Sequence, residues 1–136
     1  MKPTFQKVLL IIALLASSMQ AFADADKQRI ESVLEVLRQS VNTHDYSMLE
    51  PLLDEDFTYQ GQSDYVSTMI IKKVVADYPR EITGITILDI SQLEDGWKVE
   101  VRLESPEKPD NRQVTISSDY QIRQADIADI QISGHG

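Results

Sequence analysis

The nine residues Val41-Asn42-Thr43-His44-Asp45-Tyr46-Ser47-Met48-Leu49 mark the point where one helix ends and another begins. Before them, apolar residues at helical spacing predict an amphipathic helix over residues 25–41, with one stripe facing the core. Residues 42–45 interrupt that pattern, and Asp45 or Ser47 is expected to cap a short second helix. Ser47 and Glu50 also have the spacing of a capping box. The segment therefore predicts two successive helices.

The next stretch predicts a short strand and a third helix. Asp54-Glu55-Asp56 is interpreted as a polar turn, and residues 57–59 as a short strand. Ser63 or Asp64 is expected to cap the third helix, and Pro79 to end it. The expected core stripe of this helix consists of Val66, Met69, Ile70, Val74 and Tyr78.

Residues after Pro79 predict an antiparallel sheet. Residues 82–90 are rich in β-branched side chains, and Asp95-Gly96 is typical of a hairpin turn. Residues 97–104 alternate apolar with charged side chains, which predicts one buried and one solvated face. A further strand is expected over 114–122, a turn at 124–126, and a last strand through Ile127, Ile130 and Ile132. The order ααβαββββ predicts an α+β fold.

Two segments resemble a known family. Residues 41–49, followed by Leu53-Asp54-Glu55-Asp56-Phe57-Thr58-Tyr59, resemble the opening of the nuclear transport factor 2-like superfamily, and residues 126–132 resemble its closing strand. That superfamily includes ketosteroid isomerases and SnoaL-type cyclases. The resemblance implies a cone, in which a curved sheet wraps around the long first helix and encloses a pocket. It also implies homodimers formed through the sheet face.

The first 23 residues are interpreted as a secretory signal peptide. Lys2 and Lys7 give a positive start, residues 8–16 are uninterruptedly apolar, and Ala21-Phe22-Ala23 has the small-x-small pattern of a cleavage site. The sequence thus predicts a signal peptide over 1–23 and one domain over 24–136. The domain is expected to be periplasmic or secreted after cleavage near Ala23.

The charge and the cysteine and histidine content of the chain limit which partners and ligands it is expected to bind. Eleven of the 13 basic residues and all 22 acidic residues follow residue 23, which gives the predicted domain a net charge of −11. This charge argues against nucleic acid and anionic membrane surfaces. The chain has no cysteine, which leaves no lipoprotein anchor, and its two histidines are far apart. No metal site, cofactor or membrane anchor is therefore predicted.

Aromatic residues are the best candidates for a binding site. An apolar pocket with a few orienting hydroxyls would suit a small apolar ligand, although the same residue types also form ordinary cores. The candidate ligand-binding residues are Tyr59, Tyr65, Met69, Trp97 and Tyr120.

The sequence favours a binding role over catalysis. In ketosteroid isomerases, which the chain resembles, a carboxylate base stands at the position of about Gly61 and a tyrosine at the position of Leu37. Neither glycine nor leucine has a side chain that can transfer a proton. His44-Asp45 is interpreted as a helix cap and not as a catalytic dyad, and Asp119 as an outward-facing strand residue. The leading hypothesis is non-catalytic binding of a small apolar ligand or a protein partner. The alternative is an isomerase, dehydratase or cyclase that uses Tyr59, Asp119 or His44.

Overall fold

The computed structural model describes residues 25–128, so the predicted signal peptide and the predicted strand positions Ile130 and Ile132 lie outside the described part. A long helix over residues 25–42 comes first. The elements after it are α2 (Tyr46–Leu49), a 3₁₀ turn (Glu50–Leu52), β1 (Leu53–Thr58), α3 (Asp64–Asp77), β2 (Gly84–Leu93), β3 (Gly96–Glu104), β4 (Asp110–Ser117) and β5 (Ile122–Asp126). The predicted order ααβαββββ is confirmed.

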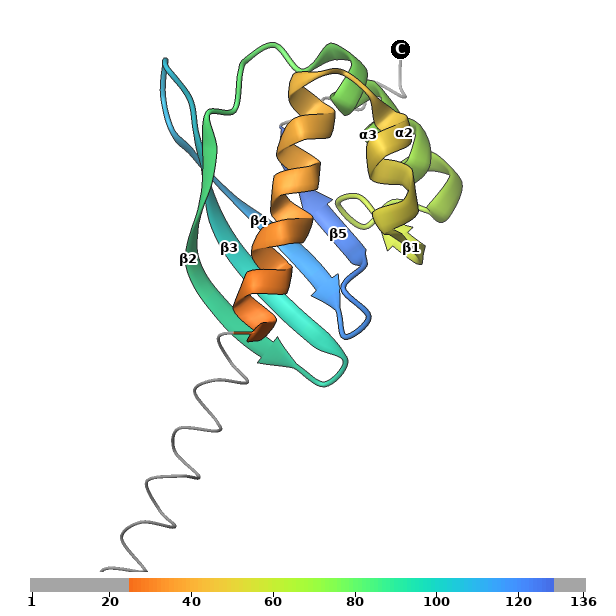
Figure 1. Ribbon diagram of the computed structural model, residues 1–136. Coiled ribbons are helices and arrows are strands. Elements are labelled where there is room, and N and C mark those ends of the chain that lie inside the picture. Colours follow the sequence, from red (N-terminus) through yellow and green to blue (C-terminus); the bar gives the residue numbers. More distant parts are fainter. Residues whose placement is uncertain (1–24, 129–136) are drawn as a thin grey trace, which may run out of the picture.

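The strands form one sheet, in the order β1-β5-β4-β3-β2. Strand β1 pairs with β5 in parallel, and the other three pairs are antiparallel. The sheet is curved, and the helices cover one of its faces, as Figure 1 shows with the long helix lying across β2 and β3. This arrangement is the predicted α+β cone.

The turn between the long helix and α2 is built as the sequence predicts. His44 takes the left-handed conformation (φ 55°), and Asp45 N–H donates to the carbonyl of Ser40, which satisfies a free carbonyl at the helix end. The Asp45 carboxylate then accepts from the backbone N–H of Ser47 at 3.1 Å. Asp45 is therefore the cap of α2, one of the two residues proposed for that role.

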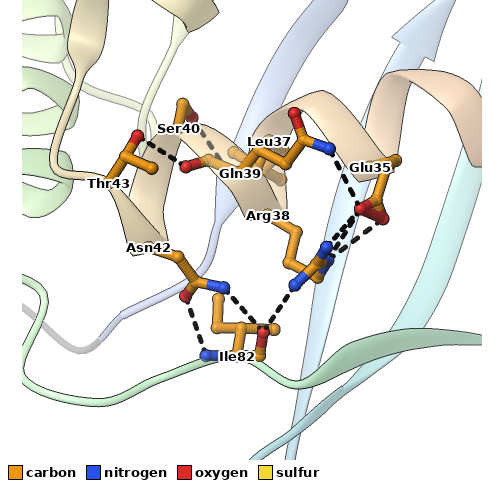
Figure 2. A network of polar contacts seen from close by, with 8 residues as sticks. All are labelled: Glu35, Leu37, Arg38, Gln39, Ser40, Asn42, Thr43 and Ile82. Carbon is orange, nitrogen blue, oxygen red and sulfur yellow. Dashed lines mark hydrogen bonds and ion pairs between the residues drawn. The ribbon is translucent and has the colours of Figure 1, made fainter.

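The end of the long helix is fixed to the segment before β2. Asn42 forms two hydrogen bonds with the backbone of Ile82: its amide donates to the carbonyl at 2.8 Å, and its oxygen accepts from the N–H at 2.9 Å. Arg38 donates to the same carbonyl at 3.2 Å, while Glu35 binds its guanidinium (Figure 2). These contacts set where the chain enters the sheet.

The core stripe of α3 was predicted partly wrong. The predicted residues Val74 and Tyr78 are buried, but Met69 is 54% exposed and Val66 and Ile70 are only half-buried. The stripe runs instead through Ser67, Ile71, Val74 and Val75. Ser67 explains the shift, because its hydroxyl accepts from Tyr59 N–H and donates to the carbonyl of Gln62, and so turns a polar position inward.

Three predicted turns and strands also differ from the structure. Residues 54–56 lie in β1, because parallel pairing with β5 extends this strand back to Leu53. The predicted strand over 114–122 is two strands, and the predicted turn at 124–126 lies within β5. Ser117 causes the break, since its hydroxyl accepts from the N–H groups of Asp119 and Gln121 and closes a tight turn.

The alternation predicted for residues 97–104 is confirmed. Val99, Val101 and Leu103 are at most 2% exposed and face the helices, while Glu100 is exposed on the other face. We call that second face the outer face of the sheet. The buried side chains fill the space between sheet and helices in a single core cluster.

Candidate functional site

A hollow of about 470 Å³ lies on the outer face of the sheet. All five strands contribute to it, and every lining side chain except one is polar or charged. The lining residues are Asp56, Thr58, Leu93, Lys98, Gln113, Thr115, Arg123 and Gln124.

Strand register places the centre of this hollow in one row. Thr58 is the partner of Gln124 across β1 and β5, Gln124 is the partner of Thr115, and Thr115 is the partner of Lys98. Partners across a sheet project from the same face. The row therefore runs across four strands as a continuous polar band. The band offers hydrogen-bond donors and acceptors on a broad, rigid support.

Charges of both signs border the band. The guanidinium of Arg123 pairs with Asp95 in the turn between β2 and β3. This hydrogen bond, together with the Asp95 charge and those of Asp54 and Asp56, raises the pKa of Arg123. Lys98 lies on the same face as this pair. The hollow thus suits a partner with mixed charge, and its lining includes no histidine, the residue most often used for general acid–base catalysis.

Tyr59 is buried in the core and its hydroxyl is fully engaged. The hydroxyl donates to the carbonyl of Ala128 at 3.0 Å and accepts from the N–H groups of Ile127 (3.3 Å) and Ala128 (3.1 Å). Burial, the largest influence, raises the pKa of Tyr59. This predicted ligand-binding residue therefore holds the chain that leaves β5.

Tyr65 and Met69 lie on the surface of α3. Their exposed fractions are 76% and 54%, because α3 turns Ile71 and Val75 toward the core in their place. Neither residue lies beside Tyr59 in the buried cluster. The structure therefore does not bring these two predicted residues into a shared cavity with Tyr59.

Trp97 and Tyr120 do come together. Their rings stack with centroids 5.2 Å apart, and the guanidinium carbon of Arg29 lies 4.6 Å from the Tyr120 ring centroid. The Tyr120 hydroxyl donates to Asp26 at 2.6 Å, and this hydrogen bond is the main reason that the pKa of Tyr120 is raised. The cluster joins the start of the long helix to the turn after β4, in which Tyr120 has a left-handed backbone (φ 61°).

The residues considered for catalysis have structural partners or face solvent. A ring nitrogen of His44 lies 2.9 Å from the carbonyl oxygen of Val75, and Asp45 caps α2, so the two do not form a dyad. Asp119 is exposed in the turn after β4, not on a strand. Gly61 and Leu37 stand at the positions where the resemblance implies a base and a tyrosine, and Leu37 is 1% exposed.

Among residues 25–128, no three histidine, cysteine, aspartate or glutamate side chains lie close enough together to hold a metal ion. In the same part of the chain, no helix is long and apolar enough to cross a membrane.

Reasoning from the sequence missed most of the hollow. The alternation of apolar and charged side chains over residues 97–104 places Lys98 on the solvated face, so this residue of the hollow could be located from the sequence. Thr115 and Arg123 share the outward parity predicted for Asp119, whereas Gln124 was assigned to a turn instead of β5. Asp56 was assigned to a turn instead of β1.

Comparisons with known proteins identify the family. Residues 23–134 match the family model described as "TcaA protein NTF2-like domain". No curated protein matches the chain. A crystal structure of an NTF-2 like protein of unknown function from Burkholderia xenovorans LB400 is similar, with 13% identity, 78% of this chain and 90% of that chain covered, and a TM-score of 0.43. A structure named "Rd1NTF2_04 with long sheet" covers 68% of this chain and 94% of its own, with 15% identity and a TM-score of 0.43.

Proposed function

This chain belongs to the family of TcaA protein NTF2-like domains, and we propose that it is a non-catalytic binding domain that recognises a protein partner through the outer face of its sheet. The observation that carries the proposal is the polar band Thr58–Gln124–Thr115–Lys98, set in a hollow to which every strand contributes. A sheet face of this kind holds its backbone in place before a partner binds, which lowers the loss of conformational entropy on binding.

A packed interior supports a surface role. Leu37, Tyr59, Val101 and Ile116 are all at most 1% exposed within the core. Three hollows lie at the periphery of the described part of the domain. One is between the long helix and β2, one is on the outer face of the sheet, and one is beside Tyr78. A small apolar ligand would find an apolar lining in none of these three, because polar or charged side chains line most of each.

Catalysis has less support than binding. A general acid or base must be within hydrogen-bond reach of substrate and titrate near the working pH. The hydroxyl of Tyr59 is engaged with three backbone groups, and His44 contacts the backbone of Val75. We further propose that the domain acts outside the cytoplasm, on the pattern of residues 1–23.

Site-specific photocrosslinking tests the proposal. A benzophenone amino acid at Thr115 places the crosslinker in the hollow, and the same amino acid at Thr68 places it on α3 as a matched control. Irradiation of cells that produce the exported protein is expected to yield one discrete adduct for Thr115 and none for Thr68. The adduct mass distinguishes a second copy of the chain from a different protein.

A charge reversal makes the test specific. Lys98→Glu is expected to abolish the Thr115 adduct, whereas Lys108→Glu, which makes the same change in an exposed loop, is expected to leave it intact. Equal adducts at Thr68 and Thr115, or no adduct at Thr115, would overturn the proposal.

A further inference from the structure

We propose that the edge of β2 over residues 84–87 is a docking site for an extended, basic segment of a partner protein, which adds to the sheet as a further strand. This site is separate from the outer-face hollow, so it goes beyond the proposed function. The proposal rests on an unpaired strand edge, a groove beside it and an incompletely satisfied carboxylate.

The edge comes from the sheet order. Strand β2 stands last in the order β1-β5-β4-β3-β2, and among residues 25–128 it has a strand neighbour only on its β3 side. An unpaired edge presents backbone N–H and C=O groups that an extended peptide can bind. The register shifts between Ile87 and Asp89, which bends the strand there. The regular part of the edge therefore ends at Ile87.

A groove lies between this edge and the long helix. Its volume is about 320 Å³, and its lining is Glu31, Ser32, Leu34, Glu35 and Ile85. Leu34 is 2% exposed and Ile85 is half-buried, so the floor is apolar, while Glu31 and the ion pair between Glu35 and Arg38 form the rim. In an added strand, the residue opposite Ile85 would project toward this groove, because cross-strand partners share a face. An aliphatic side chain fits that position.

The other face offers a carboxylate. Glu104 is the partner of Gly84, and its side chain is 39% exposed; its Oε1 has no hydrogen bond among the described residues and forms only a long ion pair, 4.0 Å from Arg102 Nε. A Cβ added at Gly84 would meet nothing within 4 Å. A lysine or arginine opposite Gly84 in an added strand can therefore reach across the glycine to Glu104. Such a charge-assisted hydrogen bond would complete the unsatisfied group.

The site is held in place before any partner binds. Arg38 and Asn42 bind the backbone of Ile82, two residues before β2 (Figure 2).

The charge beside the edge bears on the choice of partner. Glu31 makes no ion pair with any of residues 25–128. A second copy of the chain would bring its own Glu31 against this one, and like charges repel. The charge of Glu31, which has no ion-pair partner within residues 25–128, therefore favours a basic segment of another protein.

A synthetic peptide of alternating lysine and valine tests the inference. It is acetylated and amidated, carries a fluorophore and is titrated into the purified protein. We expect saturable binding that weakens with salt, and hydrogen-exchange protection of β2 backbone amides between residues 84 and 87. The same peptide with a central proline in place of valine is expected not to bind, because it cannot continue a strand ladder.

Two variants locate the lysine contact. Glu104→Gln is expected to weaken binding of the peptide by about three-fold, the size of one partly exposed ion pair. Gly84→Val is expected to weaken it as well by blocking the path to Glu104, without changing charge. Glu100→Gln makes the same substitution on the same strand and face beyond the bulge, and should leave binding unchanged.

Several results would overturn the inference. They are no binding, equal binding of the proline peptide, equal effects of Glu104→Gln and Glu100→Gln, or protection that appears in β4 and β5 instead of β2. None of these depends on the outer-face adduct at Thr115, so this site and the proposed function can fail separately.

Discussion

The hydroxyl of Tyr59 shows how much a single buried polar group organises. It joins the end of β1 to Ile127 and Ala128, which follow β5, a separation of 68 or 69 residues along the chain. A hydroxyl on an inward-facing strand position needs a partner, which is why Tyr59 suggested a ligand contact. In the structure, that hydroxyl has backbone partners both as a donor and as an acceptor of hydrogen bonds.

Tyr59→Phe is expected to destabilise the protein by about 1–3 kcal/mol, since it leaves two N–H donors and one carbonyl without their partner. Tyr65→Phe removes the same atom from a side chain that is 76% exposed, and should change the free energy of unfolding by less than about 0.5 kcal/mol. Urea denaturation of both variants checks this. Similar values for the two would mean that the hydroxyl of Tyr59 has no structural role.

Stability should also fall at alkaline pH. Burial raises the pKa of Tyr59 and of Tyr78 above the ordinary value of 10.0. The unfolded state therefore loses these protons first, and the free energy of unfolding should decrease as the pH rises above about 10. Denaturation between pH 8 and 11 measures the slope, which Tyr59→Phe should reduce. A slope that is the same in the variant would contradict the assignment.

Among the single elements, β2 and β3 each contain a glycine, and the two glycines differ in how closely other atoms surround them. A Cβ on Gly96 would lie 2.1 Å from the carbonyl oxygen of Ile116, whereas one on Gly84 would meet nothing within 4 Å. Gly96→Ala should therefore cost about 1–3 kcal/mol or more, because β3 and β4 must separate. Gly84→Ala should stay within about 0.5 kcal/mol. Thermal unfolding of both variants gives the comparison, and equal midpoints would contradict the packing.

The register of α3 is tested by two substitutions on the same helix. Ile71 is fully buried, and Ile71→Ala should cost about 2–5 kcal/mol. Met69 is 54% exposed, and Met69→Ala should cost less than about 0.5 kcal/mol. The sequence pattern predicts the reverse, with Met69 in the core. Chemical denaturation therefore decides between the two registers.

Elements with strong patterns could be predicted from the sequence, and those set by single hydrogen bonds could not. The capped turn at Asp45, the hairpin at Gly96 and the alternation through Val101 depend on local rules. The turn after β4 depends on the hydroxyl of Ser117, and the α3 register on that of Ser67, and nothing in the pattern signals either bond. The assignment of Asp56 and Gln124 to turns also concealed part of the outer-face hollow.

The whole molecule combines a filled interior with a polar outer face. The core cluster takes side chains from the long helix, α3 and the strands β1, β3, β4 and β5, and half-buried isoleucines of β2 pack against it. The hollow lies on the opposite side of the sheet, where Lys98 and Arg123 meet the acidic groups around them. The candidate aromatic residues are divided between these environments, with Tyr59 inside and Tyr65 outside. We therefore place the function of the domain on its surface.

The most direct test of this account is a native mass spectrum of the protein purified from the cells that produce it, compared with the spectrum of the same sample after denaturation. A packed interior predicts the mass of the polypeptide alone, or of a protein complex containing it, with no small molecule lost on denaturation. A small-molecule mass that is present in the native spectrum and disappears on denaturation would contradict the account.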